Sequence, residues 1–266
     1  YAAAPGDSAR LAEAASGWYV EDTSRLGLGR PDREPKATES IPEIVTMIEE
    51  LVSTDHAYPS GGDVYFRVES FPDYGKLSGR HGDEEATRNP SEEPEEAERK
   101  EDPRDFALWK GHKEGEDTSW ESPWGRGRPG WHIECSAMAE EVLGVGFEIH
   151  SGGNDLTFPH HENEAAQTRR ARGAELSRIW MHNGMLQMGG EKMAKSVGNI
   201  TSLADALTEH GRDAVIMFFV SGHYRQPIQF DETTMAQAAA NVRRVREAAR
   251  RLVPGASPED LAGHKE

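Results

Sequence analysis

The amino-acid sequence predicts an α/β protein in which a nucleotide-binding core is followed by an all-helical region. A glycine-rich turn at residues 151–155 joins a short apolar strand to a helix, and a second strand-like segment leads into a lysine-containing loop at 192–196. After residue 200 the patterns are helical. Because nucleotides bind beyond the carboxyl ends of strands in doubly wound sheets, where such turns lie, we expect a Rossmann-like core.

The first part of the chain contains two expected helices and one strand. Apolar residues at helical spacing predict a helix over 8–19, which a stretch rich in proline and glycine at 27–35 interrupts. Ser40 is expected to cap a second helix that has proline in its first turn and ends near Asp55. Residues 63–68 alternate and are rich in β-formers, which predicts a strand.

The middle of the chain carries an acidic run. Residues 83–102 contain ten acidic and three basic side chains, which is typical of a solvated, mobile insertion. Periodicity predicts the elements beyond it. These are a short buried strand, a helix, an apolar strand-like segment and three helices, at 147–150, 159–171, 180–188, 203–210, 212–221 and 231–252.

Composition limits the classes of function. The chain has 266 residues, a net charge of −17 and one cysteine. A single cysteine excludes an internal disulfide and fits a reducing compartment, and no apolar run approaches the roughly 20 residues that span a bilayer. We therefore expect a cytoplasmic protein without a signal peptide or membrane contact. The acidic charge argues against a broadly basic surface, so any contact with nucleic acid would depend on local basic patches.

The first candidate site combines His160, Glu164 and Cys135. Residues four apart on a helix face the same way, so His160 and Glu164 would point together. Cysteine, histidine and glutamate are all zinc ligands, and Cys135 is the one cysteine of the chain. The alternative is a helix start with acidic residues near its positive end and a buried structural cysteine. Spacing alone leaves both interpretations open.

The second candidate site is the loop at 192–196. Lys192, Lys195 and Ser196 could bind a polyphosphate, because lysine supplies a point charge and serine a hydroxyl donor. A mobile loop would close on ATP and open for product release. The alternative is an exposed loop with solvated lysines.

The third candidate site is the turn that contains Gly152, Gly153 and Asp155. Glycines let a ligand approach the backbone, and Asp155 could accept hydrogen bonds from the hydroxyl groups of a ribose. The alternative is that Asp155 caps the following helix.

Together these segments resemble the cysteinyl-tRNA synthetase family of class I aminoacyl-tRNA synthetases. Residues 130–138 (GWHIECSAM) and 150–164 (HSGGNDLTFPHHENE) are similar to its most specific motifs. Residues 192–196 resemble the lysine loop that class I enzymes share, with Ala194 in place of the usual serine. Residues 63–80 are similar to the family's connective segment.

The resemblance implies an activity. Members of the family use ATP to activate cysteine as an adenylate and then pass the acyl group to tRNA(Cys). A zinc ion in the family binds the thiol of the substrate, so the implied partners are cysteine, ATP and tRNA(Cys), with one zinc ion per chain. The resemblance assigns metal ligands at Cys135, His160 and Glu164, and substrate-binding residues at Trp131, His150 and His161.

The resemblance also assigns the nucleotide site. Lys192 and Lys195 would act in catalysis, where Lys195 stabilises the charge that develops during adenylation. The assigned ATP-binding residues are Lys195, Ser196, Gly152, Gly153 and Asp155.

The architecture of the family implies five segments and a monomer. The arginine-rich stretch at 243–251 would meet the stem of the tRNA. The segments are the end of the first half of the catalytic core, the connective insertion, the second half of the core with the zinc site and lysine loop, a helical stem-contact region, and a linker or tail, at 1–57, 58–123, 124–200, 201–252 and 253–266.

The sequence also departs from the family pattern. A further zinc cysteine and the H-I-G-H motif, which helps to hold ATP, have no match here. We therefore expect weak or absent cysteine-dependent pyrophosphate exchange by this chain alone. Two alternatives stay open: a paralogous ligase of mycothiol synthesis, which passes cysteine to an amino sugar, and a non-catalytic fragment. The connective segment and the arginine-rich helix favour the tRNA enzyme.

Overall fold

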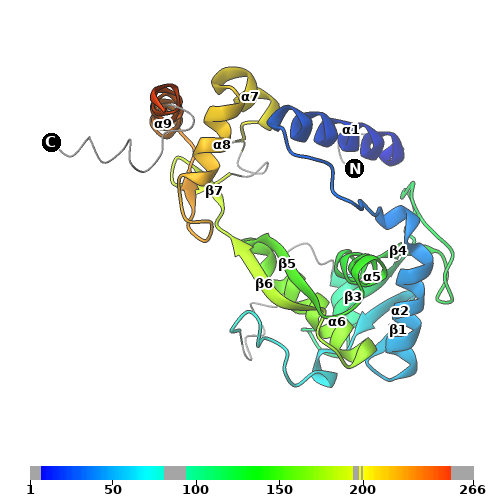
Figure 1. Cartoon of the computed structure of the whole chain (residues 1–266). Helices are drawn as coiled ribbons and strands as arrows, with labels where there is room; N and C mark the ends of the chain where they lie inside the picture. Colours follow the sequence, from blue (N-terminus) through cyan, green and yellow to red (C-terminus); the bar gives the residue numbers. More distant parts are fainter. Residues whose placement is uncertain (1–6, 81–93, 194–197, 199, 253–266) are drawn as a thin grey trace. The chain divides into compact units, whose positions relative to one another are not determined.

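The described residues fall into two compact units (Figure 1). The first unit comprises the chain up to Trp18 together with Arg30–Asn183, and the second comprises Tyr19–Gly29 together with the chain from Gly184. No described helix combines the length and the apolar character needed to cross a membrane. The computed structural model describes residues 7–80, 94–193, 198 and 200–252.

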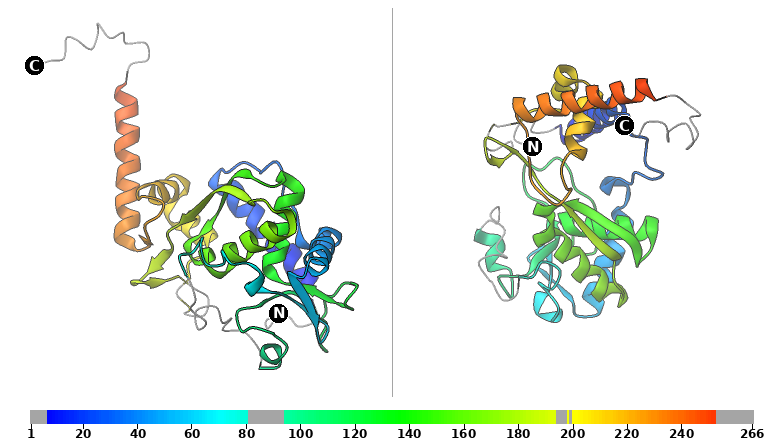
Figure 2. Two further views of the ribbon diagram at one scale, coloured as in Figure 1. Left: turned by 90° about the horizontal axis from the view of Figure 1, so that it is seen from below. Right: turned by 60° about the vertical axis from the view of Figure 1, so that its left-hand side comes forward.

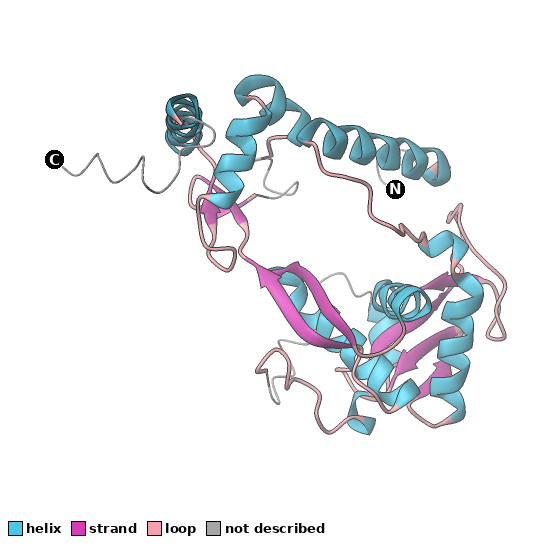
Figure 3. Cartoon of the chain, viewed as in Figure 1, coloured by secondary structure: helices cyan, strands magenta, loops and turns pink. Residues whose placement is uncertain are grey.

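An antiparallel four-stranded sheet and three helices share one hydrophobic core in the first unit (Figure 3). The elements are β1 (Ala57–Ser60), β2 (Asp63–Phe66), β3 (Phe106–Gly111), β4 (Gly127–Pro129), α2 (Ile41–Ser53), α5 (Trp131–Leu143) and α6 (Glu162–Arg172). The strands follow one another in chain order across the sheet. Leu51 of α2, Trp109 of β3 and Ile133 of α5 are fully buried in this core, which fixes the helix that carries Cys135 against the sheet.

Helix α2 confirms the helix expected behind Ser40. Its buried residues recur at helical spacing and include Ile44, Ile48 and Leu51, and burying each such side chain contributes roughly 1.5–3 kcal/mol. Ser40 occupies the N-cap position but makes no capping bond with its side chain. Its hydroxyl instead donates to the carbonyl of Lys36 at 3.3 Å, so the expected side-chain cap is wrong.

The acidic run is only partly described. The short helix α4 (Pro94–Glu98) lies within it, whereas residues 83–93 are outside the described residues. Glu96 is buried and pairs with Lys110 of β3. The backbone N–H of Glu101 donates to the hydroxyl of Tyr58 at 2.7 Å. The described end of the run is therefore attached to the sheet.

Two parallel strands position the glycine-rich turn. β5 (Phe147–Gly153) pairs with β6 (Ser177–Asn183), with Gly152 opposite His182. Only Phe147 of β5 is buried, whereas Ile149 is 52% exposed and its partner Ile179 is 55% exposed. The buried strand expected at 147–150 is therefore wrong in its burial, because the paired apolar side chains of Ile149 and Ile179 are more than half exposed.

The connection from β5 to β6 contains the predicted helix in altered form. A 3₁₀ turn, η3 (Asn154–Leu156), and a π-helical turn, η4 (Thr157–His161), precede α6. The helix expected over 159–171 therefore begins with a π turn. His160 nevertheless lies four residues before Glu164 and faces it.

Three helices of the second unit confirm the predicted ones (Figure 2). They are α7 (Leu203–His210), α8 (Arg212–Val220) and α9 (Glu232–Arg251). Their core includes Val215, Phe218 and Met235 together with Leu26 from the end of α1 (Ser8–Leu26), a longer helix than expected. A capping box between Asp231 and Thr234 fixes the start of α9.

A small sheet in the second unit was not predicted completely. It has the order β8-β7-β9, formed by β8 (Glu191–Lys192), β7 (Leu186–Met188) and β9 (Ile228–Gln229). β9 pairs with β7 in parallel and interrupts the region expected to be all-helical. The strand-like segment at 180–188 is divided between β6 and β7 at Gly184, whose N–H donates to the carbonyl of Tyr224 at 2.7 Å.

Candidate metal and amino-acid site

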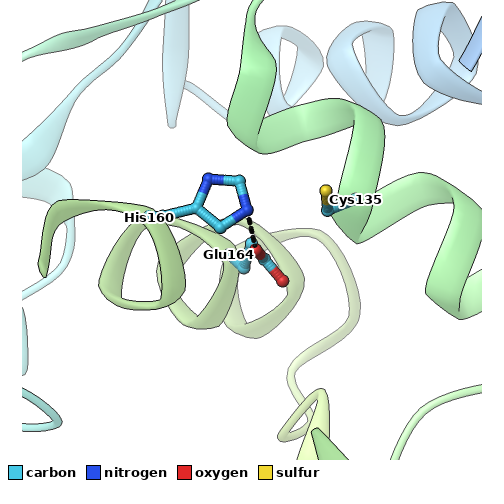
Figure 4. A group of neighbouring side chains, drawn as sticks. All are labelled: Cys135, His160 and Glu164. Atoms are coloured by element: carbon cyan, nitrogen blue, oxygen red, sulfur yellow. Dashed lines mark ion pairs between the residues drawn. The ribbon is translucent and has the colours of Figure 1, made fainter. Parts of the chain in front are cut away.

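Three side chains from separate elements converge in the first unit (Figure 4). Cys135 lies on α5, His160 in η4 and Glu164 in the first turn of α6. Their ligand atoms all lie within 4.8 Å of one another. Nε2 of His160 is 2.6 Å from Oε1 of Glu164. The structure thus brings together the three residues that the sequence suggested as metal ligands.

Glu164 is a fully buried carboxylate. Nε2 of His160 approaches its Oε1, and Nε2 of His150 lies 2.9 Å from its Oε2. Neither oxygen has a further partner among the described residues. Because a buried carboxylate is costly unless a positive group or hydrogen bonds compensate it, this site calls for a cation or for protonated imidazoles.

The donor set fits zinc. Thiolate, imidazole and carboxylate are its usual ligands, and three protein ligands leave a fourth position for a substrate. In a tetrahedral site with bonds of about 2.0–2.3 Å, neighbouring ligand atoms lie roughly 3.3–3.8 Å apart. Ligand atoms within 4.8 Å of one another can reach this spacing through small side-chain movements.

Electrostatics give the two acidic ligands opposite properties. Burial opposes ionisation of Glu164, but the hydrogen bonds from His150 and His160 outweigh it and hold the pKa of this carboxyl at about 2. Burial, assisted by the carboxylates of Glu164 and Glu134, raises the pKa of the Cys135 thiol to about 12. Without a metal ion, the cysteine therefore stays a thiol at neutral pH, and metal binding would release its proton.

The histidines around Glu164 form a second group. His150, His161 and Glu164 also place their ligand atoms within 4.8 Å of one another. Nδ1 of His161 is 2.8 Å from Nε2 of His182, and burial lowers the pKa of His161 to about 4. Because both groups contain Glu164, an ion in one group would use the carboxylate that the other needs.

Trp131 lies at the edge of the site. The residue is 60% exposed, and its ring centroid is 4.3 Å from that of His160. The ring centroid of Trp180 lies 4.8 Å from that of His150 and 5.1 Å from that of His161. The three predicted substrate-binding residues, Trp131, His150 and His161, therefore lie next to the predicted ligands His160 and Glu164.

Sequence reasoning missed two histidines of the site. Nδ1 of His132 is 2.8 Å from Nδ1 of His160, and His182 contacts His161 as described. His132 could have been found from its position three residues before Cys135 on the same helical face. His182 carried no local signal, because the pairing of β6 with β5 brings it opposite Gly152.

The glycine-rich turn borders a polar cavity. Asp155 is exposed within η3 and caps no helix, so the capping alternative is wrong. A Cβ atom on Gly152 would lie 2.8 Å from Leu156 and 3.0 Å from His161, so this glycine also allows internal packing. The cavity measures about 430 Å³ and is lined by Ser78, Arg80, Asn154, Asp155, Thr157 and Phe158.

The lysine loop is described only at its start. The backbone of Lys192 belongs to β8 and pairs with Gln187. The side chain of Lys192 lies outside the described part of the chain, as do Lys195 and Ser196. Phosphate binding by these residues stays a prediction.

Comparisons with known proteins agree with the resemblance. Residues 3–240 match the family described as tRNA synthetases class I (C) catalytic domain. The cysteine–tRNA ligase of Maridesulfovibrio salexigens is 48% identical over 242 residues, which cover 90% of this chain and 48% of that protein. The cysteine–tRNA ligase of Halorhodospira halophila is 51% identical over 239 residues, covering 90% of this chain and 51% of that protein. The chain thus spans about half the length of the curated relatives it matches.

A solved structure supports the fold. Mycobacterium tuberculosis methionyl-tRNA synthetase in complex with methionyl-adenylate is similar with a TM-score of 0.60 at 17% identity, covering 86% of this chain and 55% of that chain. The α/β class I fold expected from the sequence is confirmed. The chain belongs to the family of class I tRNA synthetase catalytic domains that includes the cysteine–tRNA ligases.

Proposed function

We propose that this chain carries the cysteine-recognition centre of a cysteine–tRNA ligase, in which Cys135, His160 and Glu164 hold a zinc ion beside the amino-acid pocket. The observation that carries the proposal is the convergence of these three side chains around a buried carboxylate. The names of the relatives support cysteine as the amino acid and tRNA as its acceptor.

The ligand set suits a choice between sulfur and oxygen. A bound zinc ion would supply a borderline-soft Lewis acid that takes the thiolate of cysteine more readily than the hydroxyl of serine. Cysteine and serine differ in this one atom. Recognition through a metal would therefore separate them without a second, editing site.

The side chains around the ligands would shape the pocket for cysteine. Trp131 is exposed beside His160 and can flank the bound thiol. His150 approaches the second oxygen of Glu164. The ring of His161 packs against the ring of His150, with centroids 4.8 Å apart. We propose that these two imidazoles orient the amino acid.

The nucleotide half of the reaction is proposed on the resemblance. The carboxylate of cysteine would attack the α-phosphate of ATP to give cysteinyl-adenylate and pyrophosphate, and the acyl group would then pass to tRNA(Cys). Catalysis would rest on positioning and on charge stabilisation by Lys195. The proposed ATP contacts are Gly152, Gly153, Asp155, Lys192, Lys195 and Ser196, and the proposed tRNA contacts are the arginines of α9.

Calorimetric titration of the zinc-loaded chain with amino acids tests the proposal. We expect L-cysteine to bind at least about 100-fold more tightly than L-serine or S-methyl-L-cysteine, because only cysteine can offer a thiolate. Zinc-free chain should lose this preference. Equal affinity for cysteine and serine in the zinc-loaded chain would contradict the proposal.

Two matched variants extend this test. Cys135→Ala should lower zinc content and remove the preference for cysteine, whereas Glu148→Gln, on the exposed face of β5, should change neither. In a protein that also contains the remainder of the ligase, charging of tRNA(Cys) against transfer to an amino sugar separates the tRNA enzyme from the mycothiol-type ligase.

A further inference from the structure

We propose that His132 is a positioning residue of the metal site: it accepts a hydrogen bond from Nδ1–H of His160 and so leaves Nε2 of His160 free to bind the metal. The inference rests on the proposed zinc site. It concerns a residue that neither the sequence motifs nor the comparisons assigned to a role.

The geometry is a direct bond between two imidazoles. Nδ1 of His132 lies 2.8 Å from Nδ1 of His160, within normal hydrogen-bond distance. The other nitrogen of His160 lies 2.6 Å from Oε1 of Glu164. His160 is 4% exposed, so both of its nitrogens are occupied by protein groups rather than by bulk water.

The chemistry of imidazole permits one arrangement once a metal is bound. A neutral imidazole carries one N–H donor and one acceptor nitrogen. A metal on Nε2 of His160 requires the lone pair there, so the proton must sit on Nδ1. Nδ1 of His132 must then be the acceptor, and the proton of His132 must sit on its Nε2.

The metal-free site can adopt the opposite arrangement. Nε2–H of His160 can donate to Glu164, while Nδ1 of His160 accepts from Nδ1–H of His132. Metal loading would then move the proton of His160 from Nε2 to Nδ1 and the proton of His132 from Nδ1 to Nε2. The total number of protons on the two rings does not change.

The position of His132 suits this role. It lies on α5 three residues before Cys135, so one helix would supply both a metal ligand and the group that orients another ligand. Its ring meets that of Phe106 edge-on, with centroids 5.9 Å apart and an interplanar angle of 88°. This packing against β3 limits the orientations of the ring.

Zinc affinity, measured by competition with a chromophoric chelator, tests the inference. We expect His132→Phe to bind zinc about 10–100-fold more weakly than the wild-type chain, which is the usual loss when such an orienting partner is removed. His132→Asn should recover most of the affinity, because its amide oxygen can accept the same hydrogen bond. His112→Phe, outside the site, is the matched control and should bind as wild type does.

A tautomer measurement separates positioning from folding. Long-range ¹H–¹⁵N spectra of the zinc-loaded chain should show the proton of His160 on Nδ1 and that of His132 on Nε2. Without metal, His132→Phe and His132→Asn should have the same thermal midpoint. Unfolding would then be excluded as the cause of the weaker zinc binding by His132→Phe. Wild-type affinity in His132→Phe, or the reverse tautomers in the loaded protein, would overturn the inference.

The outcomes also separate this inference from the proposed zinc site. Loss of zinc in His160→Ala with wild-type affinity in His132→Phe would leave the proposed site standing and refute the role of His132. A wild-type chain that binds no zinc would refute both.

Discussion

The hydroxyl of Ser136 donates a 2.5 Å hydrogen bond to Oε1 of Gln167, and both residues are fully buried. Ser136 follows Cys135 on α5, and Gln167 lies three residues after Glu164 on α6. The bond therefore joins the helix of one proposed metal ligand to the helix of another. It fixes the register between them at the point where the ligands meet.

Loss of this bond should destabilise the protein and loosen the site. We expect Ser136→Ala to lower the free energy of unfolding by about 1–3 kcal/mol, because Oε1 of Gln167 would be left buried without a donor. Ser53→Ala, which removes an exposed hydroxyl at the end of α2, should stay within about 0.5 kcal/mol of wild type. Chemical denaturation measures both, and equal effects would show that the buried bond contributes nothing special.

Asp105 joins several backbone and side-chain groups next to β3. Tyr58 donates to its Oδ2 at 2.7 Å, and the N–H of Val68 donates to its Oδ1 at 2.8 Å. The N–H of Asp102 also donates to Oδ2, at 3.2 Å. Asp105→Ala should lower the free energy of unfolding by about 3 kcal/mol, since all three donors would lose their partner inside the protein. Tyr58→Phe removes the bond to Asp105 and the bond from the N–H of Glu101, and should cost about 1–2 kcal/mol. Equal costs for the two variants in urea denaturation would count against this arrangement.

Glu134 should make stability depend on pH near neutrality. Burial raises its pKa to about 7, although Arg128 and His160 oppose the shift. Because a carboxyl with a raised pKa favours folding only while it is protonated, its contribution is complete below about pH 4.3, the usual pKa of glutamate. It is lost as pH rises through about 7. As the pH rises from 5 to 8, the wild-type chain should therefore lose stability relative to Glu134→Gln.

Denaturation of the metal-free chain at several pH values measures this difference. Glu148→Gln, which removes an exposed carboxylate, controls for the loss of one negative charge. Parallel profiles for wild type and Glu134→Gln would show that Glu134 ionises in the folded protein as it does in the unfolded chain.

Gly184 is expected to tolerate no side chain. A Cβ atom there would lie 2.2 Å from the carbonyl oxygen of Gln226, and backbone cannot move aside as a flexible side chain can. Gly184→Ala should therefore cost about 1–3 kcal/mol or more of unfolding free energy. Gly29→Ala, where nothing lies within 4 Å, should be nearly neutral. A neutral Gly184→Ala in a thermal melt would contradict the close packing of β7 against the segment before β9.

Local patterns in the sequence predicted the features that depend on near neighbours. The apolar stripe of α2 and the spacing of His160 and Glu164 follow from helical geometry, so both were predicted correctly. Features that depend on distant partners were missed. Gly184 meets Tyr224, and β7 meets β9, only through the folded chain.

The candidate site shows the same division. Cys135 was predicted as a ligand because the motif resemblance and the chemistry of cysteine point to it. That Cys135 lies beside Glu164 of α6, in contrast, depends on the packing of α5 against α6. His182 reaches His161 through strand pairing, which no local pattern of charge or hydropathy encodes. Ile149 was expected in the core because an apolar residue in a strand is usually buried, but its side chain is 52% exposed.

The first coordination shell of zinc, measured by X-ray absorption on the loaded chain, tests the central claim most directly. Because Cys135 is the one cysteine of the sequence, a single sulfur at about 2.3 Å with nitrogen or oxygen ligands at about 2.0–2.1 Å would identify it as a ligand. The sulfur should disappear in Cys135→Ala. A shell of nitrogen and oxygen alone in the wild-type chain would place the ion at His150, His161 and Glu164 instead, and would contradict the account.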